Sequence, residues 1–170
     1  VLHENLISKV DNLIIGGGMA NTFLYASGSP IGKSLYEPDF KETVNEIHEL
    51  AKKYDCKIYL PVDVVVSKDF IKNADHKIVN INECPSDHMI LDIGEKSIQL
   101  YKKIISSSKT ILWNGPLGAF EIKPFDKGTS ELAKYTSYIT KNKKCVSVAG
   151  GGDTLAALNS INVTEDFTYV

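Results

Sequence analysis

A run of three glycines, Gly150–Gly152, is the feature that most constrains how this chain can fold. It follows residues 145–149, whose small and β-branched side chains are typical of a strand buried on both faces. It precedes a stretch typical of a helix, for which Asp153 or Thr154 can serve as the N-cap. Bare glycines let a ligand approach the backbone closely, and a helix N-terminus favours anions such as phosphate. The same residues are compatible with an ordinary strand-to-helix turn, so this stretch alone leaves both interpretations open.

Asp153 adds a condition to the phosphate interpretation. A carboxylate repels a phosphate group unless a cation lies between them, and Mg²⁺ prefers one or two carboxylates together with phosphate oxygens. The sequence therefore predicts either that Asp153 only caps the helix, or that the ligand arrives as a magnesium–phosphate complex.

A second glycine run, Gly16–Gly18, follows an apolar segment at residues 13–15 and precedes residues 19–25, which we expect to be helical. Two strand–glycine–helix units in one domain suggest that two glycine turns lie at the rim of one cleft. Neither unit has the spacing G-x-G-x-x-G, so the dinucleotide-binding fingerprint is absent.

The loop 114–121 follows a third apolar strand, residues 110–113. Open parallel sheets bind ligands at the C-terminal ends of their strands, which is where this loop begins. Asn114 can donate or accept a hydrogen bond, and Glu121 can accept from two ribose hydroxyls. A structural turn with a capping Asn114 is the alternative interpretation.

Strands and helices alternate along the chain, which indicates a parallel sheet with right-handed crossovers. We therefore predict an α/β fold, a three-layer Rossmann-like parallel sheet with helices on both faces. Apolar spacing predicts helices over residues 1–10, 19–25, 39–54, 95–107 and 129–140. Further strands are expected over residues 57–60, extending through 61–66, at a short edge strand near 78–81, and at the end, 166–170.

Composition limits the class of partner. With 170 residues, of which 43% are apolar, the chain can form one domain with a sizeable core. A formal net charge of −2 argues against nucleic acid as a partner. No apolar run approaches the about 20 residues of a membrane span. The three cysteines lack metal-ligand spacing and favour a cytoplasmic protein with reduced thiols. Lys33 could reach an anion, but we expect it to be a solvated surface lysine.

Seven segments, taken together, resemble phosphoglycerate kinase, in particular the C-terminal, nucleotide-binding domain of the bacterial type. They occur in the family's order, cover nearly the whole chain, and include the two glycine runs. They are Ile14–Ala20, Gly32–Tyr36, Leu60–Val64, Ile90–Gly94, Thr110–Pro116, Gly118–Glu121 and Ala149–Thr154.

The resemblance implies a glycolytic phosphotransferase that moves a phosphoryl group between 1,3-bisphosphoglycerate and ADP, giving 3-phosphoglycerate and ATP. It implies Mg²⁺ as cofactor and a hinge closure of two domains, with chemistry that consists mainly of positioning and charge stabilisation. Residues 1–170 would then be an incomplete nucleotide-binding domain, part of the C-terminal domain of a monomeric two-domain enzyme. The phosphoglycerate would bind to the other domain, and we expect this chain alone to bind nucleotide weakly and not to catalyse.

The resemblance also implies roles for individual residues. Gly151, Gly152, Asp153 and Thr154 would hold the nucleotide phosphates, with Gly151 and Gly152 at the catalytic position and Asp153 as the magnesium ligand. Glu121 would hold the ribose. The remaining expected contacts, around the adenine, the sugar and the phosphates, are Gly17, Gly18, Leu91, Pro116 and, near the phosphates, Asn114.

Two other classes of function stay open at this point. A dinucleotide-binding oxidoreductase domain is disfavoured by the missing fingerprint, and a preference for NADH over ADP would support it. A non-catalytic α/β interaction module, in which the glycines are only turns, would remain stable and show no response to nucleotide.

Overall fold

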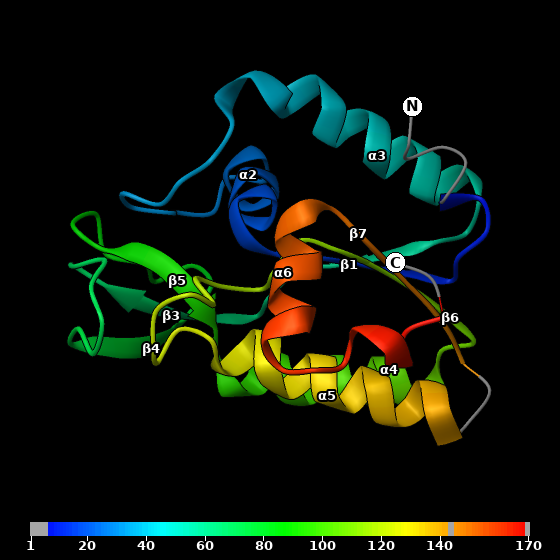
Figure 1. Ribbon diagram of the computed structural model, residues 1–170. Coiled ribbons are helices and arrows are strands. Elements are labelled where there is room, and N and C mark those ends of the chain that lie inside the picture. Colours follow the sequence, from blue (N-terminus) through cyan, green and yellow to red (C-terminus); the bar gives the residue numbers. More distant parts are fainter. Residues whose placement is uncertain (1–6, 143–144, 169–170) are drawn as a thin grey trace.

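The computed structural model describes residues 7–142 and 145–168 (Figure 1). The helix expected over residues 1–10 falls mostly outside this part of the chain. The described elements form two β-sheets and five α-helices, with short 3₁₀ turns at Pro38–Phe40 and Thr164–Asp166.

A parallel sheet forms the centre of the molecule, as the alternation of strands and helices predicted. It contains four strands in the order β2-β1-β6-β7, and every neighbouring pair is parallel. Ile15, Asn114 and Gly150 lie side by side in the register, so three strands end at the same level. The strands are β1 (Asn12–Ile15), β2 (Lys57–Tyr59), β6 (Thr110–Asn114) and β7 (Val146–Gly150).

Helices cover both faces of this sheet, which confirms the three-layer prediction (Figure 1). Side chains alternate between the faces of a strand, so Leu13 and Ile15 of β1 pack in one core with α2 and α3. Ile14, between them, packs in the opposite core with α4, α5 and α6. The helices are α2 (Gly17–Ala26), α3 (Lys41–Lys53), α4 (Glu95–Ser107), α5 (Lys127–Asn142) and α6 (Gly152–Ser160).

A second sheet was not predicted from the sequence. It is antiparallel, has the strand order β4-β3-β5, and lies beside the parallel sheet (Figure 1). The prediction that the strand at 57–60 extends through 61–66 is therefore wrong, because the chain leaves one sheet after β2 and joins the other at β3. The strands are β3 (Asp63–Ser67), β4 (His76–Asn80) and β5 (Met89–Ile93).

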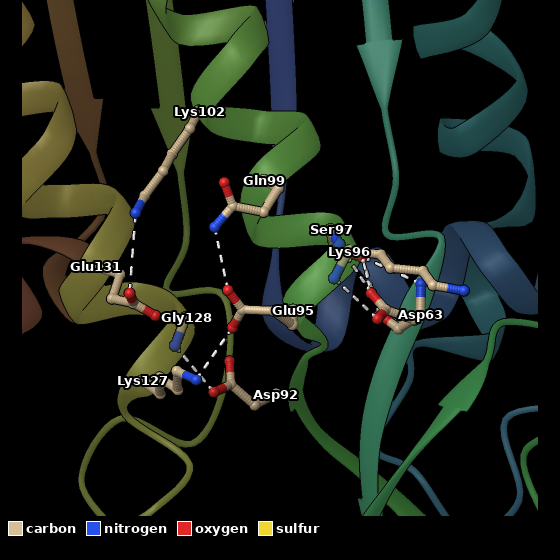
Figure 2. Close-up of polar contacts among 10 residues, drawn as sticks. All are labelled: Asp63, Asp92, Glu95, Lys96, Ser97, Gln99, Lys102, Lys127, Gly128 and Glu131. Atoms are coloured by element: carbon tan, nitrogen blue, oxygen red, sulfur yellow. Dashed lines mark hydrogen bonds and ion pairs between the residues drawn. The ribbon is translucent and has the colours of Figure 1, made fainter.

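The change of sheet has a local cause at Pro61 and Asp63. Pro61 has no N–H to donate to a ladder. The buried carboxylate of Asp63 accepts hydrogen bonds from the backbone N–H of Lys96 (3.1 Å) and of Ser97 (2.8 Å) in the first turn of α4 (Figure 2). Asp63 thus fixes the start of β3 to a helix below the parallel sheet.

Two further differences concern the end of the chain and the membrane. Up to Thr168 the predicted C-terminal strand is absent; instead Thr164–Asp166 forms a 3₁₀ turn, and Thr168 exchanges hydrogen bonds with Ser147 through side-chain hydroxyls. Within the part of the chain that the structure describes, none of the helices has the length and apolar character needed to cross a membrane.

Candidate functional site

The first glycine turn, after β1, is packed tightly against the loop that follows β6. A Cβ added at Gly16 would lie 2.7 Å from both Leu117 Cδ2 and the carbonyl oxygen of Pro116. Gly17 has φ of +61°, in the region that favours glycine, and is the first residue of α2. Glycine is needed here because two segments of backbone come close together.

The second glycine turn, after β7, has open surroundings. No described atom lies within 4 Å of a Cβ added at Gly150 or at Gly152. Gly151 has φ of 98° and is the N-cap of α6, with no side-chain hydrogen bond to the cap. The first N–H groups of a helix have no partner within the helix, so this helix end is available to an anion.

The prediction that Asp153 or Thr154 caps this helix is wrong, because Gly151 occupies the N-cap position. Asp153 lies in the first turn of α6 and is exposed. Thr154 is only 1% exposed, and its hydroxyl oxygen accepts a hydrogen bond from the N–H of Gly115 at 2.8 Å. Thr154 therefore connects α6 to the loop after β6, and its hydroxyl group already has a hydrogen-bond partner inside the protein.

A cavity of about 600 Å³ opens where the three strand ends meet the antiparallel sheet. Its lining combines the first glycine turn, strand β5, the loop after β6 and the start of α6. The cavity brings together most of the residues expected at the site: Gly17, Gly18, Leu91, Pro116, Glu121 and Asp153.

The other predicted residues lie beside this cavity or outside the described atoms. Gly151 and Gly152 precede Asp153 at the open end and are exposed. Asn114 is the last residue of β6, paired in register with Gly150, and its side chain falls outside what the structure describes. Apart from Leu91, which lies on β5 of the antiparallel sheet, the predicted residues thus follow one edge of the parallel sheet, from the β1 turn to α6.

Lys33 is a cavity residue that was not among the predicted site residues, since a solvated surface lysine was favoured over contact with an anion. Its side chain is exposed and lines the cavity. Gly32 orients this loop, because φ of +56° and a Cβ position 2.1 Å from the carbonyl oxygen of His88 exclude other residues. The Gly32-Lys33-Ser34 segment carried the resemblance, and that was the available signal.

Further residues line the cavity that were not among the predicted site residues, although Leu35 and Asp92 lie in two of the segments that carried the resemblance. Leu35 and Phe70 are exposed and line the cavity from different loops. Asp92 also lines it although only 2% of its surface is exposed, and burial raises the pKa of its carboxyl group to about 7.

The donor set of the cavity suits a nucleotide with its magnesium ion. Among the described residues no group of three or more His, Cys, Asp or Glu side chains could hold a metal alone. Mg²⁺ usually keeps few protein ligands and takes phosphate oxygens instead. Asp153, beside a bare helix N-terminus, offers one carboxylate of that kind.

Comparison with known proteins identifies the family. The family model described as phosphoglycerate kinase matches residues 1–170. The chain is 54% identical to the phosphoglycerate kinase of Zymomonas mobilis over 166 residues, which is 98% of this chain and 42% of that protein. It is 53% identical to that of Methylorubrum extorquens over 169 residues, 99% of this chain and 42% of that protein.

Solved structures agree with these relatives. The phosphoglycerate kinase of Coxiella burnetii matches with a TM-score of 0.88 and 42% identity, covering 99% of this chain and 42% of that one. That of Pyrococcus horikoshii matches with a TM-score of 0.70 and 24% identity, covering 99% and 43%, a likeness that concerns the fold alone.

The chain therefore spans 42% of the length of the curated relatives that it matches. These findings give no support to a dinucleotide-binding oxidoreductase or to a non-catalytic interaction module. Because the family model matches the whole sequence, the chain belongs to the phosphoglycerate kinase family.

Proposed function

We propose that this chain supplies the magnesium–nucleotide site of a cytoplasmic phosphoglycerate kinase. The enzyme would transfer a phosphoryl group between 1,3-bisphosphoglycerate and ADP, giving 3-phosphoglycerate and ATP. Residues 1–170 would belong to the C-terminal domain of a monomeric two-domain enzyme, with the phosphoglycerate bound by residues outside this chain. On this proposal the isolated chain binds nucleotide without catalysing transfer.

The observation that carries the proposal is a single cavity lined both by apolar residues such as Leu91 and by Asp153 on the first turn of α6. An adenine ring needs an apolar slot, and the phosphates need N–H donors and positive charge. The mixed lining of this cavity supports a nucleotide site.

Within this site the base would lie between the Gly17–Gly18 turn and Leu91, with Pro116 beside the sugar. Glu121 would accept hydrogen bonds from the ribose hydroxyls. This arrangement selects a nucleoside by shape at the base and by charge at the ribose.

The phosphates would lie at the N-terminus of α6, against the backbone of Gly151 and Gly152 and close to Thr154. Asp153 would hold the magnesium ion, which supplies charge neutralisation between the phosphate oxygens. The residues of this chain contribute by fixed N–H dipoles that need no reorganisation as charge develops on the transferred group. The exposed Lys33 lines the same cavity, and Asn114, at the end of β6, pairs in register with Gly150 beside this helix end.

The first test is an ADP titration of the intact protein by calorimetry, with and without Mg²⁺. We expect saturable binding that Mg²⁺ strengthens. Asp153→Asn should remove about tenfold of the magnesium-dependent affinity, because the loss of one charged ligand costs about 1.4 kcal/mol or more. Trp113, whose Nε1 donates to the carbonyl oxygen of Gly115 at 2.6 Å, provides a fluorescence signal from the neighbouring loop.

Glu165→Gln is the matched control, since it removes the same charge from an exposed position outside the cavity. It should leave ADP binding unchanged. Binding that ignores both Mg²⁺ and Asp153→Asn, or NADH displacing ADP with clear preference, would contradict the proposal.

A further inference from the structure

The loop between β6 and α5 carries much of the cavity wall, including Pro116 and Glu121, yet it has no regular structure of its own. Its position depends on contacts with strand β5. The N–H of Ala119 donates to the carbonyl oxygen of Leu91 at 2.7 Å. At its base, the N–H of Leu117 donates to the hydroxyl of Thr129 at 3.0 Å.

Asp92 of β5 lies between the two ends of this loop. Its Oδ2 accepts a hydrogen bond from the N–H of Gly128 at 3.0 Å (Figure 2), and its Oδ1 accepts one from the N–H of Ile93 at 2.8 Å. A Cβ added at Gly118 would lie 2.6 Å from Oδ1, and one at Gly128 would lie 2.5 Å from the same atom. Glycine on both sides makes room for one buried carboxylate.

We propose that Asp92 is a positioning residue of the nucleotide site, which holds the loop between β6 and α5, residues 115–126, so that Pro116 and Glu121 line the cavity. The inference rests on the proposed function. Asp92 need not touch the nucleotide, because its hydrogen bond to Gly128 fixes where the loop ends and α5 begins.

The charge on Asp92 gives this role a pH dependence. The pKa of its carboxyl group is raised to about 7, mainly by burial and to a smaller extent by the charge of Asp126, although the N–H donors of Gly128 and Ile93 and the charge of Lys127 act in the opposite direction. Below that pH the carboxyl takes up a proton. One carboxyl oxygen then carries a proton and acts as a donor. The N–H groups of Gly128 and Ile93 therefore no longer each have a carboxylate oxygen as acceptor.

Other charged groups surround Asp92 in both cavities that it lines. A smaller cavity of about 410 Å³ is lined by Asp92 and Ile93 of β5 together with residues of β4 and α4. The charged or titratable side chains lining the two cavities are Lys33, Glu121 and Asp153 in the larger one, and His76, Lys77, Glu95 and Lys127 in the smaller one.

The test compares Asp92→Asn with a matched control, Asp63→Asn, in the intact protein. Both carboxylates are buried and both accept backbone N–H groups, but Asp63 holds the first turn of α4 instead of the loop (Figure 2). Asp92→Asn replaces one carboxylate oxygen with an amide NH₂ group, so the side chain loses its charge and one of its two acceptor oxygens. The N–H groups of Gly128 and Ile93 then compete for a single oxygen, whereas the size of the side chain hardly changes.

The first readout is hydrogen exchange without any ligand. We expect the amides of residues 118–121 to exchange about tenfold faster in Asp92→Asn, the size of one hydrogen bond to a charged group. In Asp63→Asn the faster exchange should fall in the first turn of α4. Wild-type protein compared at pH 8 and pH 6, after correction for intrinsic rates, should show the same loosening of the loop and needs no variant to fold.

The second readout is the affinity for adenosine, which carries no phosphate that titrates near pH 7. Wild-type protein and Asp63→Asn should bind adenosine several-fold more tightly at pH 8 than at pH 6. Asp92→Asn should bind it about tenfold more weakly than wild type at pH 8 and show no such pH dependence.

Loop exchange or adenosine affinity that is unchanged by Asp92→Asn at pH 8 would overturn the proposal. So would an equal effect of Asp63→Asn on the loop. If the wild-type protein bound neither adenosine nor ADP, the proposed function would fail instead, and the exchange rates would still decide whether Asp92 positions the loop.

Discussion

Gly16–Gly18 and Gly150–Gly152 each connect a strand of the parallel sheet to a helix, but the space around them differs. Backbone and side-chain atoms of the β6 loop lie within 3.0 Å of a Cβ added at Gly16, whereas no described atom lies within 4 Å of one added at Gly150 or Gly152. The first run lets two parts of the protein pack together. The second leaves a helix end open. The same short motif therefore serves close packing in one place and leaves a helix N-terminus accessible in the other.

Among substitutions in the two glycine runs, we expect Gly16→Ala to have the largest effect on the free energy of unfolding. The new methyl group would meet two backbone atoms, the carbonyl oxygen of Pro116 and Cα of Leu117, and the side-chain Cδ2 of Leu117. We therefore expect a loss of about 3 kcal/mol in the free energy of unfolding. Gly150→Ala, the control in the open turn, should change it by about 0.5 kcal/mol or less. Urea unfolding measures both, and equal losses would refute the distinction.

Gly151→Ala is expected to have an intermediate effect, with a different cause. The residue has φ of 98° and ψ of 143°, a conformation nearly restricted to glycine, so we expect a loss of about 1–2 kcal/mol from backbone strain. Gly17→Ala should cost more, because φ of +61° is combined with a Cβ position 2.9 Å from the carbonyl oxygen of Pro116. Thermal and urea unfolding of the two variants test this order; a Gly151→Ala protein as stable as Gly150→Ala would contradict it.

Gly152→Ala should have the smallest effect on the fold and the most selective effect on binding. Its methyl group has free space, so the free energy of unfolding should change by about 0.5 kcal/mol or less. The same group would occupy the approach of a phosphate to α6, so ADP affinity should fall several-fold while adenosine affinity stays constant.

Gly18→Ala is the control for the ratio of ADP affinity to adenosine affinity. Its Cβ would make only an ordinary contact, 3.9 Å from the carbonyl oxygen of Leu35. It lies at the opposite end of the cavity from Asp153 on our proposal. Calorimetry with both ligands decides the matter: a fall in ADP and adenosine affinity by the same factor in Gly152→Ala would place the phosphates elsewhere.

Local patterns in the sequence predicted the layers and several element bounds, because they depend on the alternation of apolar residues. The helix expected over 95–107 is α4, Glu95–Ser107. The second sheet was missed because an apolar run such as Val64–Val66 looks the same in a parallel or an antiparallel strand. Its place was decided by a contact distant in sequence, between Asp63 and Ser97.

Candidate site residues that follow the ends of strands could be predicted from the sequence. Residues whose position depends on contacts distant in sequence could not. Gly17, Pro116 and Asp153 follow β1, β6 and β7, and the register of the sheet brings them to one edge. The cap was mispredicted because Thr154 turns inward to the N–H of Gly115, a partner that no local rule reveals. Asp92 was overlooked because its importance lies in what packs around it.

The cavity wall draws on both sheets, since Leu91 lies on the antiparallel sheet and Asp153 follows the parallel one. On our proposal, the contact of Leu91 with the base and that of Asp153 with the magnesium ion are thus encoded in separate stretches of sequence. Changes at well-separated sites tend to combine additively. On the same proposal, natural variation at Leu91 can alter the selectivity for the base while Asp153 and its helix stay as they are, and a protein engineer can alter one selectivity without rebuilding the other.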